Sequence, residues 1–205
     1  MNKRVLSAMP SQTIAEGALD AAQQTGELSY DGYKKVWSDE FNGDSLNRAD
    51  WNVETHEKGW VNDELQEYVD SAENIQVKDG KLIINPVKKV TDGDTGSTKG
   101  VASYTSGRVS TQNKQTFIYG RFECRAKVPK GQGYLPAFWL MANDENVYGQ
   151  WPRCGEIDCM EVMGQETNKA YGTLHYGNPH SQSQGTYTIT DGADFSDSVS
   201  RYGKV

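Results

Sequence analysis

The ten residues 155–164, which read GEIDCMEVMG, constrain the fold more than any other stretch of the chain. Three acids, Glu156, Asp158 and Glu161, stand there among apolar residues of the kind that fill a core. Side chains of a β-strand alternate between its two faces, so a regular strand places Glu156 and Asp158 on one face and Glu161 on the other. A β-bulge between Asp158 and Glu161 resets the alternation and returns Glu161 to the face of the other two. We therefore predict one bulged strand with three carboxylates on the same face.

Such a strand predicts acid and base chemistry. By strand rise the two glutamates lie roughly 13 Å apart at Cα, and side chains that lean toward each other reach a carboxylate separation of about 5 Å, as retaining glycoside hydrolysis requires. Mutual repulsion raises the pKa of at least one of three acids that share a face, which keeps a general acid protonated near neutral pH. The alternative interpretation is a solvated acidic strand face without function.

The remaining pattern also favours strands. Residues 119–128, YGRFECRAKV, alternate between apolar side chains (Phe122, Cys124, Ala126, Val128) and charged ones, as a strand with one face on a core does. Asp79-Gly80 stands between two β-prone runs and predicts a hairpin, because both residues tolerate a positive φ. Many short strands with little helix predict an all-β fold, a jelly-roll β-sandwich of two antiparallel sheets.

The composition limits the kinds of partner that the chain can bind. The net charge of −7 over 205 residues argues against a nucleic-acid partner, and no segment reaches membrane-spanning length, so we expect no membrane partner either. The three cysteines have no metal-like spacing and are expected to be small buried thiols. Residues 1–33 are expected to form a leader or linker, with a short helix begun by the capping-box spacing of Thr13 and Glu16. No signal peptide is visible in this segment.

The acidic strand resembles the active-site signature of glycoside hydrolase family 16, in the bulged Glu-x-Asp-x-x-Glu form. That form is typical of laminarinases and related endo-β-1,3-glucanases, and of some algal galactan hydrolases. The resemblance runs from about residue 34 to 198 and includes the blocks VWSDEFNG, GWVNDELQEY, YTSGRVST, YGRFECRAKVPKGQGYLPAFWLM and TLHYG. It implies a catalytic domain over residues 34–205.

The resemblance implies roles for the three acids. Glu156 corresponds to the nucleophile and Glu161 to the general acid/base, and Asp158 assists through hydrogen bonding and charge balance. Trp151 and Trp139 correspond to aromatic residues that line the substrate cleft, where sugar rings stack on them. For Trp139, packing in the core is an equally good interpretation.

Further substrate-binding residues are implied outside the acidic strand. Asn62, Glu64 and Gln66 alternate in NDELQ, so an extended segment would aim all three the same way. Arg108 corresponds to a cleft arginine that donates hydrogen bonds to sugar hydroxyls. His175 corresponds to a histidine beside the catalytic acids.

The resemblance implies no cofactor for catalysis. Glu40 and Gly80 resemble positions that help to hold a structural calcium in some relatives, although the aspartate that completes that site near the family's C-terminus is not in this chain. One position also departs from the family pattern, because Leu135 stands before Pro136 where relatives have Trp.

A larger departure follows DFSDS near residue 198. Family members continue with several further strands, whereas this chain reads VSRYGKV, and we expect these seven residues not to match the family. The catalytic domain is therefore expected to be C-terminally truncated. A sandwich that lacks strands leaves unpaired edges and an uncovered core face, so we expect lower stability than in full-length relatives and self-association through exposed sheet edges.

The sequence thus predicts a retaining endo-glycoside hydrolase that cleaves β-1,3-glucan of the laminarin type, or mixed β-1,3/1,4-glucan, by double displacement. Two alternatives stay open. One is a hydrolase of agarose-like or carrageenan-like galactans, and the other is a β-glucan-binding protein without turnover. The family resemblance implies an extracellular or cell-surface location.

Overall fold

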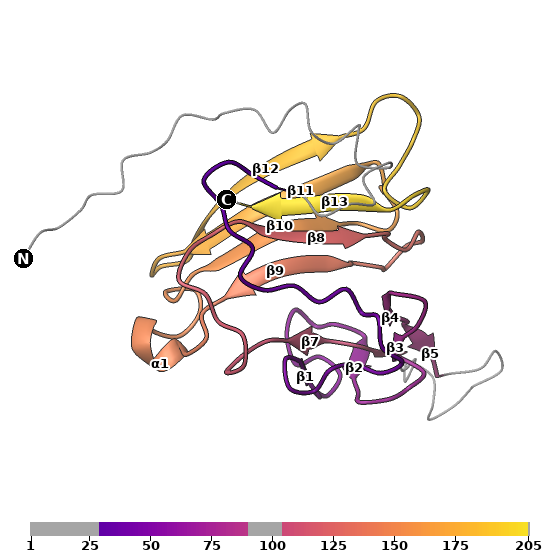
Figure 1. The fold of residues 1–205 in the computed structure, drawn as a ribbon, viewed down its shortest axis with the longest axis horizontal. Coiled ribbons are helices and arrows are strands. Elements are labelled where there is room, and N and C mark those ends of the chain that lie inside the picture. Colours follow the sequence, from indigo (N-terminus) through magenta and orange to yellow (C-terminus); the bar gives the residue numbers. More distant parts are fainter. Residues whose placement is uncertain (1–28, 90–103, 205) are drawn as a thin grey trace, which may run out of the picture. The chain divides into compact units, whose positions relative to one another are not determined.

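The computed structural model describes residues 29–89 and 104–204, and these residues form two compact units (Figure 1). Of the described residues, the first unit, here the sheet unit, comprises 29–33 and 119–204. The second, here the loop-rich unit, comprises 34–89 and 104–118. The helix expected at Thr13 and Glu16 lies outside the described residues.

The sheet unit contains the larger strands. A four-stranded antiparallel sheet has the order β12-β11-β10-β9, and β13 pairs with β8 in a second antiparallel sheet. The strands are β8 (Phe122–Ala126), β9 (Ala137–Met141), β10 (Glu156–Val162), β11 (Lys169–Tyr176), β12 (Ser181–Thr188) and β13 (Ser200–Lys204). One short helix, α1 (Glu145–Tyr148), follows β9 and is capped by the Asp144 side chain, which accepts from the Asn146 backbone N–H.

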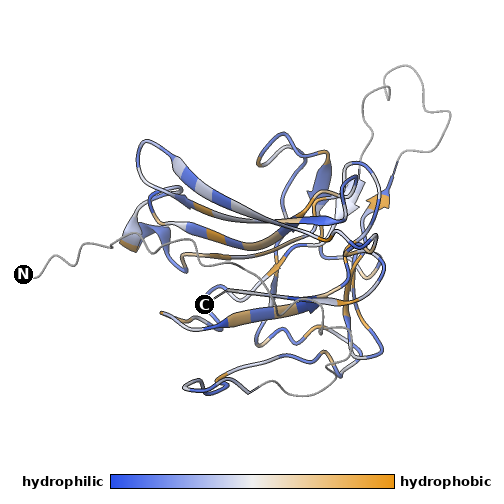
Figure 2. Cartoon of the chain, turned by 90° about the horizontal axis from the view of Figure 1, so that it is seen from above, coloured by the Kyte–Doolittle hydropathy of each residue, from blue (hydrophilic) through white to orange (hydrophobic). Residues whose placement is uncertain are grey.

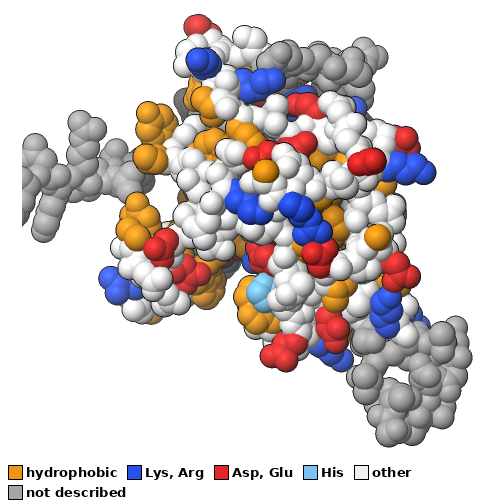
Figure 3. All heavy atoms as spheres, turned by 60° about the horizontal axis from the view of Figure 1, so that its bottom comes forward, with side chains coloured by type: hydrophobic (Ala, Val, Ile, Leu, Met, Phe, Trp, Pro, Cys, Tyr) orange, Lys and Arg blue, Asp and Glu red, His pale blue; other side chains and the backbone are white. Residues whose placement is uncertain are grey.

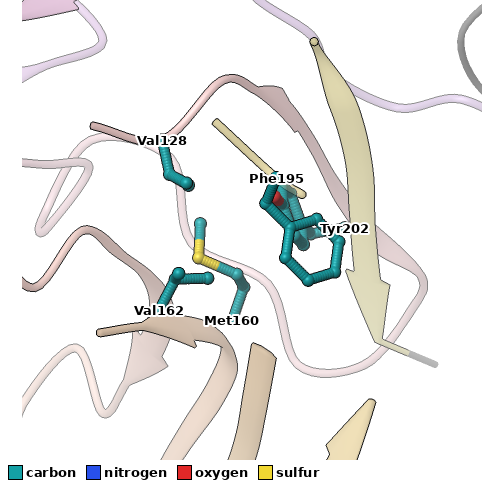
Figure 4. Packing of buried hydrophobic residues seen from close by; sticks show 5 residues of the cluster. All are labelled: Val128, Met160, Val162, Phe195 and Tyr202. Carbon is teal, nitrogen blue, oxygen red and sulfur yellow. The ribbon is translucent and has the colours of Figure 1, made fainter. Parts of the chain in front are cut away.

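A small hydrophobic core fills the sheet unit. Its buried members come from β10, from β13, and from the segments that follow β8 and precede β13. Their side chains converge in Figure 4: Val128, Met160, Val162, Phe195 and Tyr202. Val128 is 2% exposed, which confirms that the apolar face predicted for residues 119–128 points inward. Figure 2 shows the corresponding alternation of hydrophobic and hydrophilic residues along the strands.

The loop-rich unit consists of short strands joined by turns. Its strands are β1 (Asn52–Val53), β2 (Gln66–Tyr68), β3 (Ile75–Val77), β4 (Leu82–Ile84), β5 (Val87–Lys88), β6 (Tyr104–Ser106) and β7 (Val109–Ser110). They pair as β1-β7, β2-β6-β5 and β3-β4. The β3-β4 hairpin confirms the predicted turn, because Asp79 and Gly80 have φ values of 53° and 68°.

The all-β prediction is confirmed, with differences in detail. The described residues form five sheets rather than two, and β2 pairs with β6 in parallel. The residues expected to depart from the family do take part in the fold. Residues 200–204 form β13, and Tyr202 is buried in the core.

The surface carries charges of both signs, and the cysteines are free thiols. On the face seen in Figure 3, Lys and Arg side chains are interspersed with Asp and Glu rather than gathered in one patch. The three cysteines (Cys124, Cys154, Cys159) are free and half-buried, and burial raises the pKa of Cys124 to about 11. No helix in the described part of the chain is long and apolar enough to cross a membrane.

Candidate active site

The bulge predicted in the acidic strand is present in β10. Its pairing register shifts between Asp158 and Glu161 on the β11 side, and between Asp158 and Met160 on the β9 side. Met160 and Val162 are both buried in the core, so Glu161 between them projects from the opposite face of the sheet. The bulge therefore places Glu161 on the face that carries Glu156 and Asp158, as predicted.

The three carboxyl groups interact electrostatically on this face. The pKa of Asp158 is raised to about 7 by burial first, and then by the charges of Glu156 and Glu161 and a hydrogen bond with the Glu156 side chain. Burial also raises the pKa of Glu161, with a further contribution from Glu156 and an opposing one from His175. The expectation that crowding keeps an acid protonated thus agrees with the site, although burial is the larger cause.

Neighbouring strands bring aromatic residues to the acids. Glu156 lies opposite His175 on β11, and Asp158 lies opposite Trp139 on β9. Phe138 packs against the core, so its neighbour Trp139 faces the acid side of the sheet, which favours the cleft interpretation over core packing.

Trp151 and His175 contact two of the acids directly. Trp151 comes from the loop before β10 and donates its indole N–H to Glu156 Oε2 at 2.5 Å. Nε2 of His175 lies 3.3 Å from Asp158 Oδ2. The ring centroids of Trp151 and His175 are 6.0 Å apart. The sheet unit thus gathers six of the predicted site residues: Trp139, Trp151, Glu156, Asp158, Glu161 and His175.

The raised pKa of Asp158 predicts a pH-dependent stability. An unfolded aspartate has a pKa of about 3.9, so between that pH and about 7 the folded protein holds a proton that the unfolded chain has lost. The stabilisation by this proton is complete at low pH and is lost as the pH rises through this window. We expect Asp158→Asn to gain thermal stability relative to the wild type from pH 4 to pH 8, measured by calorimetry. Asp31→Asn, at an exposed position, is the control. A difference in thermal stability between Asp158→Asn and the wild type that stays the same at every pH would contradict the assignment.

The loop-rich unit contains a second cluster, centred on Arg108. Its Nε donates to Glu54 Oε2 at 2.6 Å, and its guanidinium lies over Trp60 and Tyr68, at 5.0 and 5.8 Å from the ring centroids. His56 stacks on Trp60 with 3.5 Å between centroids. Contacts of this kind fix the orientation of the arginine fork and of the indole.

Charge is balanced within this cluster. Burial raises the pKa of Glu54, but the Arg108 charge and hydrogen bonds from Ser110, Arg108 and His56 outweigh it, so the net shift is downward. Glu54 is therefore held as the anion that pairs with Arg108. Glu54, His56 and Tyr68 were not predicted from the sequence. The available signal was aromatic, because Trp60 and Tyr68 flank the predicted residues in GWVNDELQEY.

The predicted alignment of Asn62, Glu64 and Gln66 is wrong for Asn62. Asn62 and Asp63 have φ values of 53° and 52°, so a left-handed turn replaces the extended segment, and β2 begins only at Gln66. Glu64 and Gln66 do come together, because the Tyr68 hydroxyl donates to Glu64 Oε2 at 3.1 Å and accepts from Gln66 Nε2 at 2.9 Å.

The residues implied for calcium are neighbours. A Cβ placed on Gly80 would lie 3.9 Å from the Glu40 carbonyl oxygen and 3.8 Å from Asn42 Oδ1. Carbonyl and amide oxygens suit calcium, which takes about six to eight oxygen ligands. Among the residues that the structure describes, no group of three His, Cys, Asp or Glu side chains could hold a metal ion. The oxygens near Gly80 thus fit calcium chemically but account for only part of its coordination.

Comparisons with known proteins agree with this geometry. The family model described as "Beta-porphyranase A-D, GH16 domain" matches residues 33–202. A glucan endo-1,3-beta-glucosidase A1 from Niallia circulans is 38% identical over 185 residues, which are 85% of this chain and 27% of that protein. A glucan endo-1,3-beta-glucosidase from Cryptopygus antarcticus is 44% identical over 143 residues, which are 69% of this chain and 50% of that protein.

Solved structures are similar as well. The laminarinase catalytic domain from Thermotoga maritima MSB8 has a TM-score of 0.72 and 37% identity, with 83% of this chain and 68% of that chain covered. The fold, the bulged acidic strand and these matches define a jelly-roll domain of the glycoside hydrolase type. The chain belongs to glycoside hydrolase family 16 and is laminarinase-like. It spans between a quarter and a half of the length of the two glucosidases.

Proposed function

We propose that the chain is an endo-acting, retaining glycoside hydrolase whose substrate is a β-1,3-glucan of the laminarin type or a mixed β-1,3/1,4-glucan. The observation that carries this proposal is the bulge of β10, which returns Glu161 to the face of Glu156 and Asp158. The names of the two glucosidases and of the laminarinase support the choice of a β-1,3-glucan.

In the first step of the proposed reaction, a carboxylate oxygen of Glu156 attacks the anomeric carbon. Glu161 gives its proton to the departing glycosidic oxygen, so the bond to the leaving sugar breaks as the glycosyl ester forms. The raised pKa of Glu161 supports this role, because an acid must hold its proton until the transition state. The Trp151 indole N–H orients Glu156 for attack.

In the second step, Glu161 takes a proton from water, and the hydroxide adds to the anomeric carbon. The ester bond to Glu156 breaks, and two inversions give net retention. Asp158 shares a hydrogen bond with Glu156 and balances the charge as Glu156 changes from anion to ester. Trp139 and Trp151 provide stacking surfaces for sugar rings, and Arg108, Asn62, Glu64 and Gln66 are proposed to bind hydroxyl groups.

A panel of polysaccharides tests the proposed substrate. Laminarin is expected to release short oligosaccharides, and a mixed-linkage glucan to be cut more slowly. The expected pattern is endo-cleavage, which lowers the molecular mass of the polymer before free glucose accumulates. Binding to insoluble β-1,3-glucan without any released sugar would show a binding protein instead.

A galactan hydrolase is the second candidate, and one observation favours it. The matching family model carries the name of β-porphyranases, which points to algal galactans. Agarose and porphyran therefore belong in the same panel. Release of oligosaccharides from either galactan, with none from laminarin, would replace the proposed substrate.

Three further proposals accompany the function. Self-association is proposed through β12, an edge strand of the four-stranded sheet whose residues are mostly exposed, and light scattering over a concentration series tests it.

An extracellular or cell-surface location is proposed because polysaccharides of this kind are too large to enter a cell intact. A structural calcium near Glu40 and Gly80 is proposed to raise thermal stability, and titration of the metal-free protein with calcium in a melting experiment tests it.

A further inference from the structure

His180 contacts two residues of the site that in turn contact the acids. It lies in the turn between β11, which ends at Tyr176, and β12, which begins at Ser181. Its ring stacks on His175, with 5.2 Å between centroids and 22° between planes, and lies 5.0 Å from the ring of Trp151. His180 thus packs against the indole that donates to Glu156 and against the imidazole that faces Asp158.

Both ring nitrogens of His175 have a partner. Nδ1 lies 2.9 Å from His180 Nε2, and Nε2 lies 3.3 Å from Asp158 Oδ2. A neutral imidazole donates from one nitrogen and accepts at the other, and the bond made by one nitrogen decides which of them carries the proton. When His180 donates its Nε2–H to His175 Nδ1, His175 must carry its proton on Nε2, directed at the Asp158 carboxyl group.

The opposite arrangement is unfavourable whether or not Asp158 is ionised. The Asp158 proton is shared with the Glu156 side chain, and Asp158 Oδ2 has no hydrogen-bond partner of its own, so Oδ2 is an acceptor in either state. If His175 carried its proton on Nδ1, the lone pair of Nε2 would face the lone pairs of this buried oxygen. Asp158 Oδ2 accepts no hydrogen bond of good geometry, so the His175 N–H is the donor placed to serve it. The other charged groups that act on this pair are Glu156 and Glu161 of the same strand.

We propose that His180 is a positioning residue for the active site: it fixes His175 as the Nε2–H tautomer toward Asp158 and supports the ring of Trp151 beside Glu156. The inference about catalysis rests on the proposed function, whereas the tautomer of His175 does not. His180 lies outside the active-site motif, in a turn four residues after β11 ends at Tyr176. The motif therefore gives no indication of its role.

Two variants separate the bond from the packing. His180→Phe retains an aromatic ring beside Trp151 but lacks the donor to His175, and His180→Gln retains a side-chain N–H donor but lacks the ring. The tautomer of His175 is read from the 15N chemical shifts of its ring nitrogens in the folded protein, and kcat and KM are measured on laminarin.

In the wild type, the shifts are expected to show protonated Nε2 and unprotonated Nδ1. His180→Phe is expected to give a mixture of tautomers and to lower kcat about tenfold, with KM within about twofold of the wild type. His180→Gln is expected to retain the wild-type tautomer. A wild-type His175 protonated at Nδ1, or an unchanged tautomer and kcat in His180→Phe, would overturn the inference.

The two proposals fail in different ways. A wild-type protein that cuts no polysaccharide, but shows the expected tautomer and its loss in His180→Phe, would refute the function and retain the structural role of His180. An active wild type whose His175 tautomer is indifferent to His180 would refute the role and retain the function.

Discussion

Glu156→Gln is expected to lower kcat on laminarin by at least about 10³-fold, because an amide cannot form the glycosyl ester. The replacement keeps the size of the side chain and an oxygen that accepts from the Trp151 indole, so the loss reports chemistry rather than packing. Reducing-sugar release with purified variants, whose folding is checked by circular dichroism, measures the effect.

Glu166→Gln is the matched control for this experiment. Glu166 lies in the same unit beyond β10, where it pairs with Lys169 at 3.0 Å and is half exposed. The control is expected to retain full kcat. Equal activity of Glu156→Gln and the wild type would remove Glu156 from the mechanism.

Phe195→Ala is expected to lower the free energy of unfolding by about 3–5 kcal/mol. Phe195 is 4% exposed, lies 5.5 Å from the ring of Tyr202, and bonds through its backbone to Val128 and Thr167. Its removal leaves a cavity in a core that has few buried members. Because a domain has about 5–15 kcal/mol in total, this single change is expected to bring the chain close to unfolding.

Urea denaturation followed by tryptophan fluorescence measures this loss. Val147→Ala is the control, because Val147 is 66% exposed on α1 and a surface change of this kind costs about 0.5 kcal/mol or less. A loss of under about 1 kcal/mol for Phe195→Ala would show that the two sheets of the unit are held together by something other than this core.

The part of the site that could be predicted from sequence is the part set by local periodicity. The steps from Glu156 to Asp158 and from Asp158 to Glu161 differ by one residue, and only a bulge reconciles them with a shared face. Asp79-Gly80 was equally readable, because its backbone preference is local and dominates a two-residue turn. Both features depend on a few neighbouring residues.

The features that escaped prediction depend on turns, strand pairing and packing that the alternation of residues does not reveal. Asn62 alternates with Glu64 in the sequence, but hydrogen bonds of the turn place it at a positive φ that alternation cannot reveal. The strand at residues 200–204 forms because β8 offers a pairing edge and the core offers a place for Tyr202. His180 carries no motif at all, and its position beside His175 and Trp151 follows from the turn between two strands.

The stereochemistry of the first product tests the central claim most directly. Proton NMR is recorded within the first minutes after the protein is added to a reduced laminari-oligosaccharide, before the anomers interconvert. If the bulged strand carries a nucleophile and an acid/base on one face, the first anomer formed is β, as in the substrate, and the α anomer appears only later by mutarotation. An α anomer that forms first would contradict the double displacement proposed for Glu156 and Glu161.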